Sequence, residues 1–453
     1  MVEAARPKSF WLDDPRMPAL APRLRGDARA DLCVVGAGFT GLWTALLAKQ
    51  ADPGLAVVVV EKDAAASAAT GRNGGFCEAS LTHGDAHGRA RFPASFDRLQ
   101  VLGRENLEGI ERFVADRRVD CGWERRGTLA VATRPWQLAE LRGDGAPPPG
   151  WLERDAVRAE IASPTYLGGV WDRDASALVN PARLAWGIRD ACLDAGVELF
   201  ERTPALEVRR NGAGACVTTP AGRVMADRVA VATNAEQPFL PRVRRRIVPV
   251  YDYVLVTEPL GAAQLAEIGW RHRQGVSDSG NRFHYYRLTE DDRVLWGGWD
   301  AVYYYGRKVS PSYDQRARTF HKLARHLHET FPSLADVGFT HRWGGAIDTC
   351  SRFCAFFGTA LGGRLAYAAG YTGLGVGASR FGAQVMVDLL WGRATERTQL
   401  DLVRTTPVPF PPEPFAWAVV QATRASLAWA DTHGGKRNAW LRLLDRAGLG
   451  FDS

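Results

Sequence analysis

The feature that most constrains the fold of this chain is a glycine-rich turn between an apolar strand and a helix, within residues 31–62. An apolar run over residues 32–35 predicts a strand that is buried on both faces. The turn Gly36-Ala-Gly-Phe-Thr-Gly41 follows directly, and good helix formers occupy residues 42–49. A second apolar strand, over residues 55–60, ends in an acid. This order of elements, within about thirty residues, predicts a dinucleotide-binding unit.

Each part of this unit has a physical role. Gly36 permits the tight turn, Gly38 lets a pyrophosphate approach the backbone, and Gly41 lets the helix pack closely on the strand. Free N–H groups and the positive end of the helix dipole then hold the anion. The acid, Glu61, is placed to accept the hydroxyl hydrogens of an adenosine ribose. We expect the following residues to contact the nucleotide: Gly36, Gly38, Phe39, Thr40, Gly41, Glu61 and Lys62.

A second glycine-rich loop follows a few residues later. Small residues over 64–70 lead into the sequence GRNGG at residues 71–75. A backbone with so few side chains can lie against a flat ring or a phosphate, whereas an ordinary turn does not need an arginine flanked by glycines. The predicted contacts from this loop are Thr70, Gly71, Arg72, Asn73, Gly74 and Gly75.

A third loop of this kind lies in the last part of the chain. An expected strand over residues 364–369 leads into GYTGLGVG at residues 370–377, and a helix is expected over residues 378–390. Strand, glycine loop and helix again direct N–H groups at one end of a ring or at an anion. The predicted contacts here are Gly370, Tyr371, Thr372, Gly373, Leu374 and Gly375.

Aromatic residues are concentrated in the alternating, strand-like sequence between residues 247 and 305. Aromatic faces can hold a protonated amine by cation–π attraction, at about 0.5–2 kcal/mol each. His284 and Tyr286 alternate and therefore share one strand face. We name these two residues, with Arg72, as candidate catalytic residues.

Composition excludes several classes of function. The chain has no run of eighteen apolar residues and no apolar stretch after its N-terminal charges, so we expect neither a membrane span nor a secretory signal, and a cytoplasmic location. The net charge of +7 comes mainly from dispersed arginines, which does not favour nucleic-acid binding. The seven cysteines are scattered along the chain, so we expect them to be reduced thiols and not disulfides. His83, Asp85 and His87 would share a face on a strand, but no fourth ligand is evident, so no metal is predicted.

The motifs GAGFTGLWTA, EK and ATGRNGGF together resemble the D-amino-acid-oxidase-type flavoprotein superfamily, and within it the glycine/D-amino-acid-oxidase-like and gamma-glutamylputrescine oxidoreductase-like branch. The resemblance implies FAD and an α/β fold: a Rossmann-like, glutathione-reductase-type FAD-binding domain with a discontinuous antiparallel-sheet (α+β) substrate domain. It also implies that residues 203–206 pass the adenine and that the strand ending near residue 234 re-enters the FAD domain. Three further FAD contacts follow from it: Ala205, Thr233 and Asn234.

The implied activity is oxidation of a C–N bond in an amine or amino-acid-like substrate. Hydride moves from the carbon next to nitrogen to flavin N5, the imine is hydrolysed, and O2 or another acceptor takes the electrons. One alternative is a flavoenzyme of the same fold that oxidises a C–OH bond of a hydroxy acid or polyol phosphate, or a tailoring dehydrogenase; Arg282, Arg287 and Arg342 would serve its anionic substrate. A non-catalytic nucleotide-binding module is the other.

Three departures from the resembled proteins affect these expectations. A cysteine that binds flavin covalently in related sarcosine oxidases pairs with Gly344 here, with Cys350 and Cys354 out of register, so we expect noncovalent FAD. A lysine that anchors the substrate carboxylate pairs with Gly377, and a lysine that assists the reaction with oxygen pairs with Trp296. A small free amino acid is therefore a less favoured substrate, and use as an oxidase or as a dehydrogenase stays open.

The predicted organisation is discontinuous. Residues 1–30 form an arm that Trp11 could anchor, and residues 401–453 form a helical tail that packs on the body in preference to a membrane surface. The FAD-binding domain is expected to comprise residues 31–85, 175–240 and 340–400, and the substrate domain residues 86–174 and 241–339.

Overall fold

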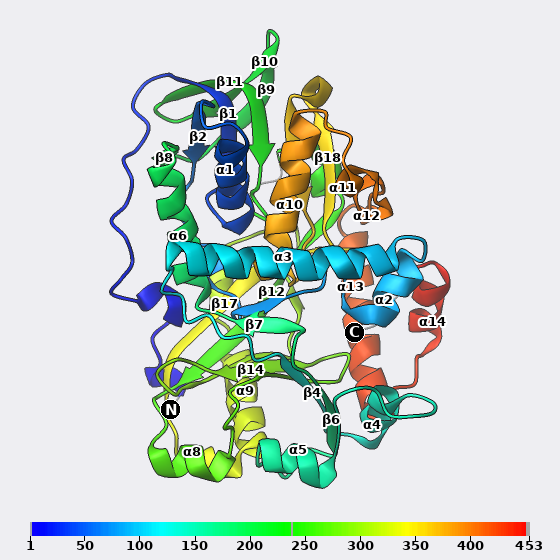
Figure 1. Cartoon of the computed structure of the whole chain (residues 1–453). Helices are drawn as coiled ribbons and strands as arrows, with labels where there is room; N and C mark the ends of the chain where they lie inside the picture. The colour runs from blue at the N-terminus through cyan, green and yellow to red at the C-terminus, as the bar shows by residue number, and fades with distance from the viewer. Residues whose placement is uncertain (1, 237–238, 450–453) are drawn as a thin grey trace.

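The computed structural model describes residues 2–236 and 239–449. Two large sheets lie one above the other, and the long helix α3 (Phe96–Arg117) crosses the molecule between them (Figure 1). A small sheet of two antiparallel strands, β3 (Phe76–Glu78) and β7 (Ser176–Leu178), lies in the same middle layer. Segments that are distant in sequence therefore meet between the sheets.

The first sheet is mainly parallel. Its main path runs β18-β19-β11-β1-β2-β8, with only β18 antiparallel. These strands are β1 (Ala28–Val35), β2 (Val57–Val60), β8 (Glu198–Phe200), β11 (Gly222–Val231), β18 (Phe356–Ala360) and β19 (Leu365–Ala369). The antiparallel strands β9 (Glu207–Asn211) and β10 (Gly214–Thr219) extend from β11. The order confirms the predicted Rossmann-like arrangement.

Three helices pack together against this sheet: α1 (Phe39–Ala51), α6 (Pro181–Asp194) and α10 (Gly375–Leu390). The apolar run at the end of β1 is almost fully buried, at 0–3% exposed, because helices cover one face and further chain covers the other. Asn180 caps α6: its side chain accepts a hydrogen bond from the Arg183 N–H. The carboxyl ends of β1 and β2 therefore point at the glycine turn and at Glu61.

The second sheet is mainly antiparallel. Its path runs β16-β12-β15-β14-β13-β4-β6-β5, with β17 also paired to β12, and only β13 and β4 pair in parallel. Its strands are β4 (Thr128–Ala132), β5 (Trp151–Glu153), β6 (Gly168–Asp172), β12 (Ile247–Thr257), β13 (Gly275–Asp278), β14 (His284–Leu288), β15 (Val294–Gly298), β16 (Val302–Tyr303) and β17 (Phe339–Cys350). Helices α4 (Pro135–Arg142), α5 (Arg154–Glu160), α8 (Ala262–Ile268) and α9 (Ala317–Thr330) surround it.

One segment differs from the sequence-based expectation. β17 pairs with β12 along almost its whole length, so it belongs to the second sheet, and the predicted boundary at residue 340 is too early. Glycine is needed there because a Cβ on Gly344 would lie 2.7 Å from the Tyr253 ring. The strand that the sequence left open for His83 and Asp85 is absent, since Asp85 lies in helix α2 (Gly84–Arg91) and His83 precedes it.

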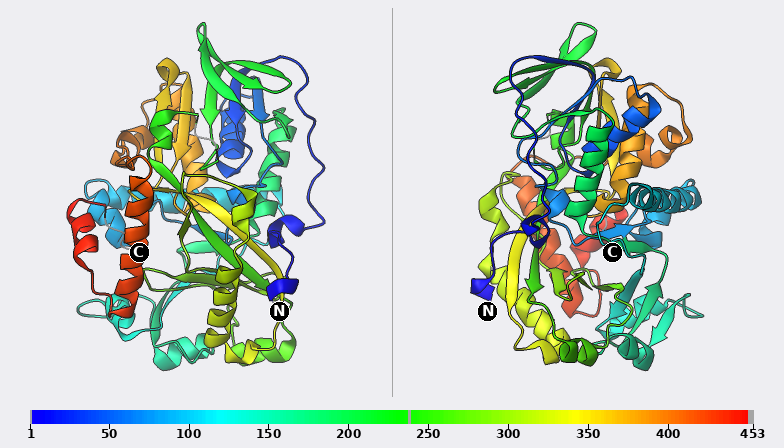
Figure 2. Two further views of the ribbon diagram at one scale, coloured as in Figure 1. Left: turned by 180° about the vertical axis from the view of Figure 1, so that it is seen from behind. Right: turned by 60° about the vertical axis from the view of Figure 1, so that its left-hand side comes forward.

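Both ends of the chain pack on the body. The Trp11 side chain is buried, and its indole N–H donates to the Asn73 carbonyl over 2.8 Å, so the arm contacts the second glycine loop. In the tail, α13 (Phe415–Thr432) and α14 (Ala439–Arg446) lie beside the junction of the two sheets (Figure 2). The indole N–H of Trp440 donates to the Thr423 hydroxyl and joins these two helices. Short helices α7 (Pro241–Arg244), α11 (Glu396–Gln399) and α12 (Asp401–Arg404) complete the chain.

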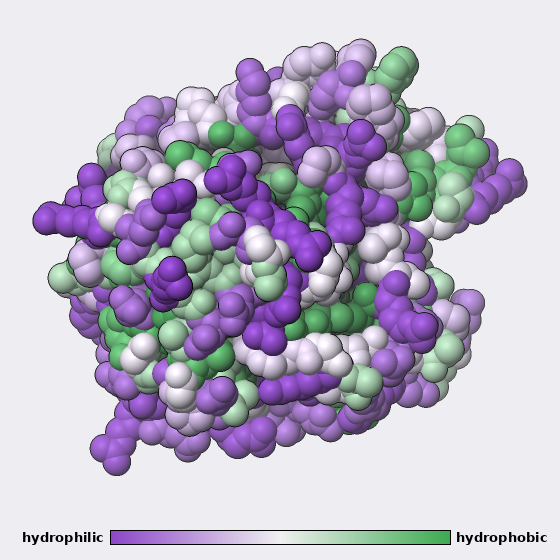
Figure 3. Space-filling model, turned by 90° about the horizontal axis from the view of Figure 1, so that it is seen from above, coloured by the Kyte–Doolittle hydropathy of each residue, from purple (hydrophilic) through white to green (hydrophobic). Residues whose placement is uncertain are grey.

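The face above the first sheet carries hydrophilic side chains with hydrophobic areas between them (Figure 3). Several of the most exposed large apolar side chains belong to the tail, and Phe415 is 65% exposed. In the part of the chain that the structure describes, every helix is too short or too polar to cross a bilayer.

Candidate active site

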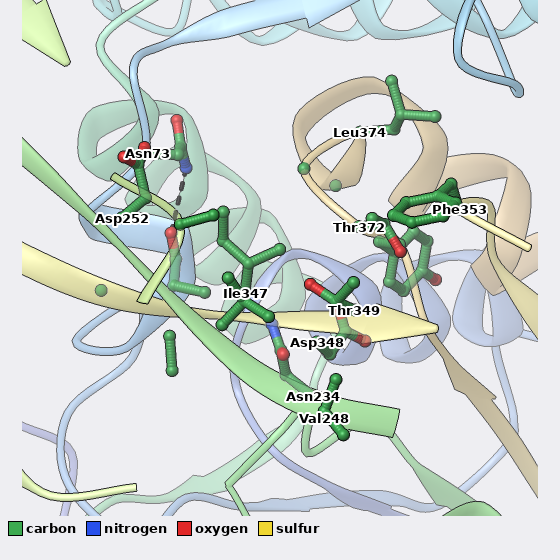
Figure 4. Close-up of a pocket in the computed structure, with 18 of the residues that line it drawn as sticks. Asn73, Asn234, Val248, Asp252, Ile347, Asp348, Thr349, Phe353, Thr372 and Leu374 are labelled. Atoms are coloured by element: carbon green, nitrogen blue, oxygen red, sulfur yellow. Dashed lines mark hydrogen bonds between the residues drawn. The ribbon is translucent and has the colours of Figure 1, made fainter. Parts of the chain in front are cut away.

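One continuous cavity of about 1150 Å³ lies between the two sheets. It is larger than a pocket for one small molecule, which measures roughly 300–1,000 Å³, and so has room for a dinucleotide and a substrate. Figure 4 shows residues of β12 and β17, of the second and third glycine loops and of the segment after β11 around this space. The predicted residues that line it are Gly36, Gly38, Phe39, Thr40, Glu61, Lys62, Thr70, Arg72, Asn73, Gly74, Ala205, Thr233, Asn234, Tyr371, Thr372, Gly373, Leu374 and Gly375. Gly41, Gly71, Gly75 and Gly370 support the loops from behind.

The first glycine turn is built as its spacing predicts. Gly36 has φ +104°, and a Cβ there would lie 2.6 Å from the Ala232 carbonyl oxygen. A Cβ on Gly41 would lie 1.8 Å from the Gly36 carbonyl oxygen, so α1 can approach β1 only without one. Gly38 meets only the Thr70 hydroxyl, at 2.9 Å, and leaves its backbone open to the cavity. The Phe39 N–H at the start of α1 donates to the Thr70 hydroxyl at 3.1 Å, and the next N–H groups have no partner within the helix and are available to an anion.

Glu61 is buried at the end of β2. One carboxylate oxygen accepts from the Ala37 N–H at 2.8 Å and the other from the Asp63 N–H at 3.0 Å. Burial raises the pKa of this carboxyl, and the two N–H donors oppose the rise. The adjacent Lys62 lines the cavity and is ion-paired with Glu236. Acceptor oxygens for ribose hydroxyls thus lie beside the glycine turn.

The second glycine loop is fixed from several directions. The Asn73 side chain donates to the Thr70 carbonyl at 2.8 Å and accepts from the Gly75 N–H at 2.9 Å. The Arg72 carbonyl accepts from the Trp343 indole at 2.8 Å, and the Arg72 guanidinium forms an ion pair with Asp314 at 2.5 Å. The loop is therefore held open toward the cavity before any ligand binds.

The third loop is organised by a buried carboxylate, Asp348 on β17. One of its oxygens accepts from the Gly370 N–H at 2.6 Å, and the Tyr371 and Thr372 N–H groups also donate to the carboxylate. Burial raises the pKa of Asp348 to about 7 despite these donors. The Thr40 hydroxyl of α1 donates to the Tyr371 hydroxyl at 3.0 Å and joins the first loop to the third. Sequence reasoning missed Asp348.

The cysteines near this loop point away from the cavity. Cys350 is fully buried, and its thiol contacts the Cys354 and Gly370 carbonyls at 3.2 and 3.5 Å. Within the described ranges, no cysteine side chain lines the cavity. Gly377 packs against β3, because a Cβ there would lie 2.3 Å from the Glu78 carbonyl oxygen.

The prediction that His284 and Tyr286 face the substrate is wrong, because both side chains lie on the face of β14 that is turned away from the cavity. Tyr286 is 1% exposed, and its hydroxyl bonds to that of Tyr166 at 2.6 Å in the core behind the sheet. His284 bonds through Nδ1 to Asp278 at 2.6 Å and through Nε2 to His326 at 2.9 Å. Trp296 lies on the same far face, with its ring 4.3 Å from that of Tyr286, and it is not among the residues that line the cavity.

The residues that face the cavity are the alternate ones. The Tyr285 hydroxyl donates to an Asp252 carboxylate oxygen at 2.5 Å, and both residues line the cavity. Burial raises the pKa of Asp252 to about 6. A Cβ on Gly74 would lie 2.6 Å from the Tyr285 ring, so this pair adjoins the second glycine loop. Glu78 also lines the cavity, and burial raises the pKa of its carboxyl.

The arginines predicted for an anionic substrate do not form one cluster. Arg287 is buried and donates to the Gly75 and Val179 carbonyls, and Arg342 donates to the Val2 carbonyl. Arg282 alone of these three lines the cavity.

Comparison with known proteins agrees with this geometry. Residues 31–389 match the family described as FAD dependent oxidoreductase. The gamma-glutamylputrescine oxidoreductase of Escherichia coli is 32% identical over 80% of this chain and 84% of that protein. The probable oxidoreductase OrdL of Haemophilus influenzae is 27% identical over 85% of this chain and 88% of that protein. The glycine oxidase structure from Geobacillus kaustophilus superposes with TM-score 0.65 and 20% identity, over 83% of this chain and 99% of that one.

The chain belongs to the FAD-dependent oxidoreductase family. The site fits this cofactor, because a glycine cradle that a Cβ would fill, a buried carboxylate for the ribose and two more loops all open on one cavity. FAD is the cofactor that the family implies.

Proposed function

We propose that this protein oxidises a C–N bond of an amine or amino-acid-like substrate. The three glycine loops would hold FAD noncovalently, and bound FAD would supply the acceptor for the hydride that leaves the carbon next to nitrogen. Water would then hydrolyse the imine, and O2 or another acceptor would take the electrons. Two proteins similar to this chain, the gamma-glutamylputrescine oxidoreductase and the glycine oxidase, carry an amine in their names. This likeness supports an amine substrate but does not identify it.

The observation that carries the proposal is the acidic lining of the cavity next to the second glycine loop. Asp252 lies there because it accepts the Tyr285 hydroxyl and a Cβ on Gly74 would meet the Tyr285 ring, and Glu78 lines the same cavity. A carboxylate in a cavity of low polarity attracts an ammonium group and repels a carboxylate of the substrate. An amine therefore suits this end of the cavity better than a hydroxy acid does.

In this proposal the residues of the chain bind and orient the substrate. The Asp252 carboxylate, fixed by the Tyr285 hydroxyl, accepts an N–H of the amine and is placed to take its proton, so that the nitrogen becomes neutral. Tyr285 and Asp252 take the role predicted for His284 and Tyr286. Arg72 lines the cavity from the second glycine loop. Its ion pair with Asp314 already neutralises its charge, so we assign it to the cofactor and not to the substrate.

The test is spectroscopic. The purified protein should show a flavin absorption spectrum, release its FAD on denaturation, and lose the visible flavin band when an amine is added without oxygen. A panel of amines, amino acids and hydroxy acids identifies the class of substrate. Bleaching by hydroxy acids alone, or a cofactor that stays on the denatured chain, would contradict the corresponding part of the proposal.

Two neighbouring tyrosines test which face of β14 meets the substrate. Tyr285→Phe removes the hydroxyl that holds Asp252 and should lower kcat/KM for an amine about tenfold, the value of one hydrogen bond of about 1.4 kcal/mol to a charged group. Tyr286→Phe removes only the bond to Tyr166 and should lower the melting temperature with little change in kcat/KM. Steady-state kinetics and thermal unfolding of both variants decide the matter. If kcat/KM falls more in Tyr286→Phe than in Tyr285→Phe, the face of β14 that carries His284 and Tyr286 meets the substrate.

A further inference from the structure

The N-terminal arm contacts several of the segments that line the cofactor part of the cavity. It is the dark blue segment that runs along one edge of the molecule, from the second sheet to β1 of the first (Figures 1 and 2). Residues 2–27 lie outside the part of the chain that matches the family, residues 31–389. The sequence predicted only that Trp11 could anchor this arm, so its contacts with the cofactor loops are a finding of the structure.

Two side chains of the arm donate hydrogen bonds to the second glycine loop. The Ser9 hydroxyl donates to the Gly71 carbonyl at 2.6 Å, and the Trp11 indole N–H donates to the Asn73 carbonyl at 2.8 Å. Both residues are buried, at 4% and 3% exposed. A Cβ on Gly71 would lie 2.6 Å from the Leu12 side chain, so the arm can pack here only against a glycine. The contact therefore depends on residues of both segments.

These bonds leave the donors of the loop free. The Arg72 carbonyl, between the two other acceptors, accepts from the Trp343 indole, so three successive carbonyls are bound by side chains from outside the loop. Within the described ranges, the N–H groups of Asn73 and Gly74 have no protein partner, and both residues line the cavity. Successive free N–H groups can bind an anionic or electronegative group. The arm thus helps to fix the loop in a conformation that is open to a ligand.

A buried ion pair joins the middle of the arm to the segment before this loop. Glu201 is 2% exposed, and its carboxylate accepts from the Ala65 N–H at 2.6 Å and from the Ala21 N–H of the arm. The Arg189 guanidinium donates to the Ala19 carbonyl at 2.8 Å and lies 3.6 Å from the same carboxylate. Because a buried charge is costly to leave unpaired, this arrangement fixes the arm at residues 19–21.

The two ends of the arm are bound to different sheets. The Leu24 N–H donates to the Thr203 hydroxyl at 3.1 Å, and the Thr203 N–H donates to the Glu61 carbonyl at 2.7 Å. At the other end, the Arg6 N–H donates to the Thr340 carbonyl of β17 at 2.8 Å. The arm therefore connects the end of β2, the second glycine loop and the second sheet.

We propose that the arm is a clasp that retains the bound cofactor, with Ser9 and Trp11 as its positioning residues. A loop that is already ordered loses little conformational entropy when a ligand binds, whereas a loose loop must be ordered in each binding event. Without the two donors, the Gly71 and Asn73 carbonyls lose their partners and the loop gains freedom to turn its N–H groups away from the cavity. Faster loss of FAD is the expected consequence. This inference concerns retention of the cofactor and does not depend on which substrate is oxidised.

The test compares FAD binding by matched variants of the full chain. Ser9→Ala and Trp11→Phe each remove one donor. Their controls are Ser163→Ala and Trp270→Phe, which remove similarly buried donors to backbone carbonyls outside the cavity lining. The Ser9→Ala/Trp11→Phe double variant should bind FAD about 10–25-fold more weakly, at roughly three- to fivefold for each neutral hydrogen bond, mainly through faster dissociation. The double control should bind FAD as wild type does.

Two further readouts separate retention of the cofactor from stability alone. In the cofactor-free protein, the melting temperatures of the double variant and of the double control should fall by similar amounts, since each loses two buried hydrogen bonds. The rise in melting temperature on addition of FAD should shrink only in the double variant. Amide hydrogen exchange at residues 71–75 should be at least about tenfold faster in the double variant and unchanged in the control.

The outcomes are distinct from those that test amine oxidation, which can fail without affecting any of them. A double variant that releases FAD at the wild-type rate, or whose rise in melting temperature with FAD is unchanged, overturns the clasp. If the double variant does not fold, Trp11→Phe against Trp270→Phe carries the same comparison. If the wild-type protein binds no FAD, the cofactor assignment is wrong, and unchanged hydrogen exchange at residues 71–75 then overturns the role of the arm separately.

Discussion

Replacement of Gly41 by alanine is expected to give a colourless protein that binds FAD at least about 100-fold more weakly, a loss of roughly 2.7 kcal/mol. The new Cβ would lie 1.8 Å from the Gly36 carbonyl oxygen, so helix α1 must move away from β1. The N–H groups at the start of α1 move with it and no longer converge on one anion. Absorbance of the purified protein and fluorescence titration with FAD measure the effect.

Two further variants separate loss of binding from loss of folding. Gly54→Ala changes a glycine in the turn before β2, where a Cβ would meet only the movable Asp52 carboxylate at 3.3 Å, so it should stay yellow. In Gly38→Ala the new Cβ would meet only the Thr70 hydroxyl, at 2.9 Å. This variant should keep a native melting temperature without cofactor, but its methyl group should obstruct the pyrophosphate. Native FAD affinity in both the Gly38 and Gly41 variants would contradict the assignment of this turn.

The cofactor loops were predictable because their requirements are local. A positive φ at Gly36 and the close approach at Gly41 follow from the path of the backbone between a strand and the next helix, and only glycine satisfies both. Asp348 could not be found in the same way. It lies more than twenty residues before the loop that it holds and on a strand of the other sheet, so only the tertiary fold brings the two together.

The substrate-facing residues required tertiary information. Alternation shows that Tyr285 and Tyr286 point to opposite faces of β14, but it does not show which face meets the cavity. One local signal was present: Asp252 is the lone charged residue in the apolar strand β12, between two buried tyrosines. A buried acid in such a strand indicates a functional role more strongly than aromatic residues do, because aromatics are common in any core.

Removal of this acid tests the proposed chemistry most directly. Asp252→Asn is expected to lower kcat/KM for an amine about 100-fold at neutral pH, since it removes the negative charge that faces the ammonium group and the acceptor for its proton. Asp291→Asn, at a half-exposed aspartate that pairs with Arg293 outside the cavity, is the matched control and should leave kcat/KM unchanged. A loss below about threefold in Asp252→Asn would exclude this residue from amine binding.

The pH dependence distinguishes this role from a structural one. Because burial raises the pKa of Asp252 to about 6, kcat/KM of the wild-type protein should fall as the pH drops below about 6, where the carboxyl becomes neutral. In Asp252→Asn this acid limb should disappear.

Stability responds in the opposite sense. A carboxyl whose pKa is raised in the folded state favours folding at low pH, and that contribution is lost as the pH rises from about 4 to about 6. The neutral asparagine avoids this loss and can still accept the Tyr285 hydroxyl, so its melting temperature at pH 7 should equal or exceed that of the wild type. A variant that is inactive and also melts well below the wild type would show that Asp252 acts on folding, whereas a stable, slow variant without the acid limb would show that it acts on the substrate.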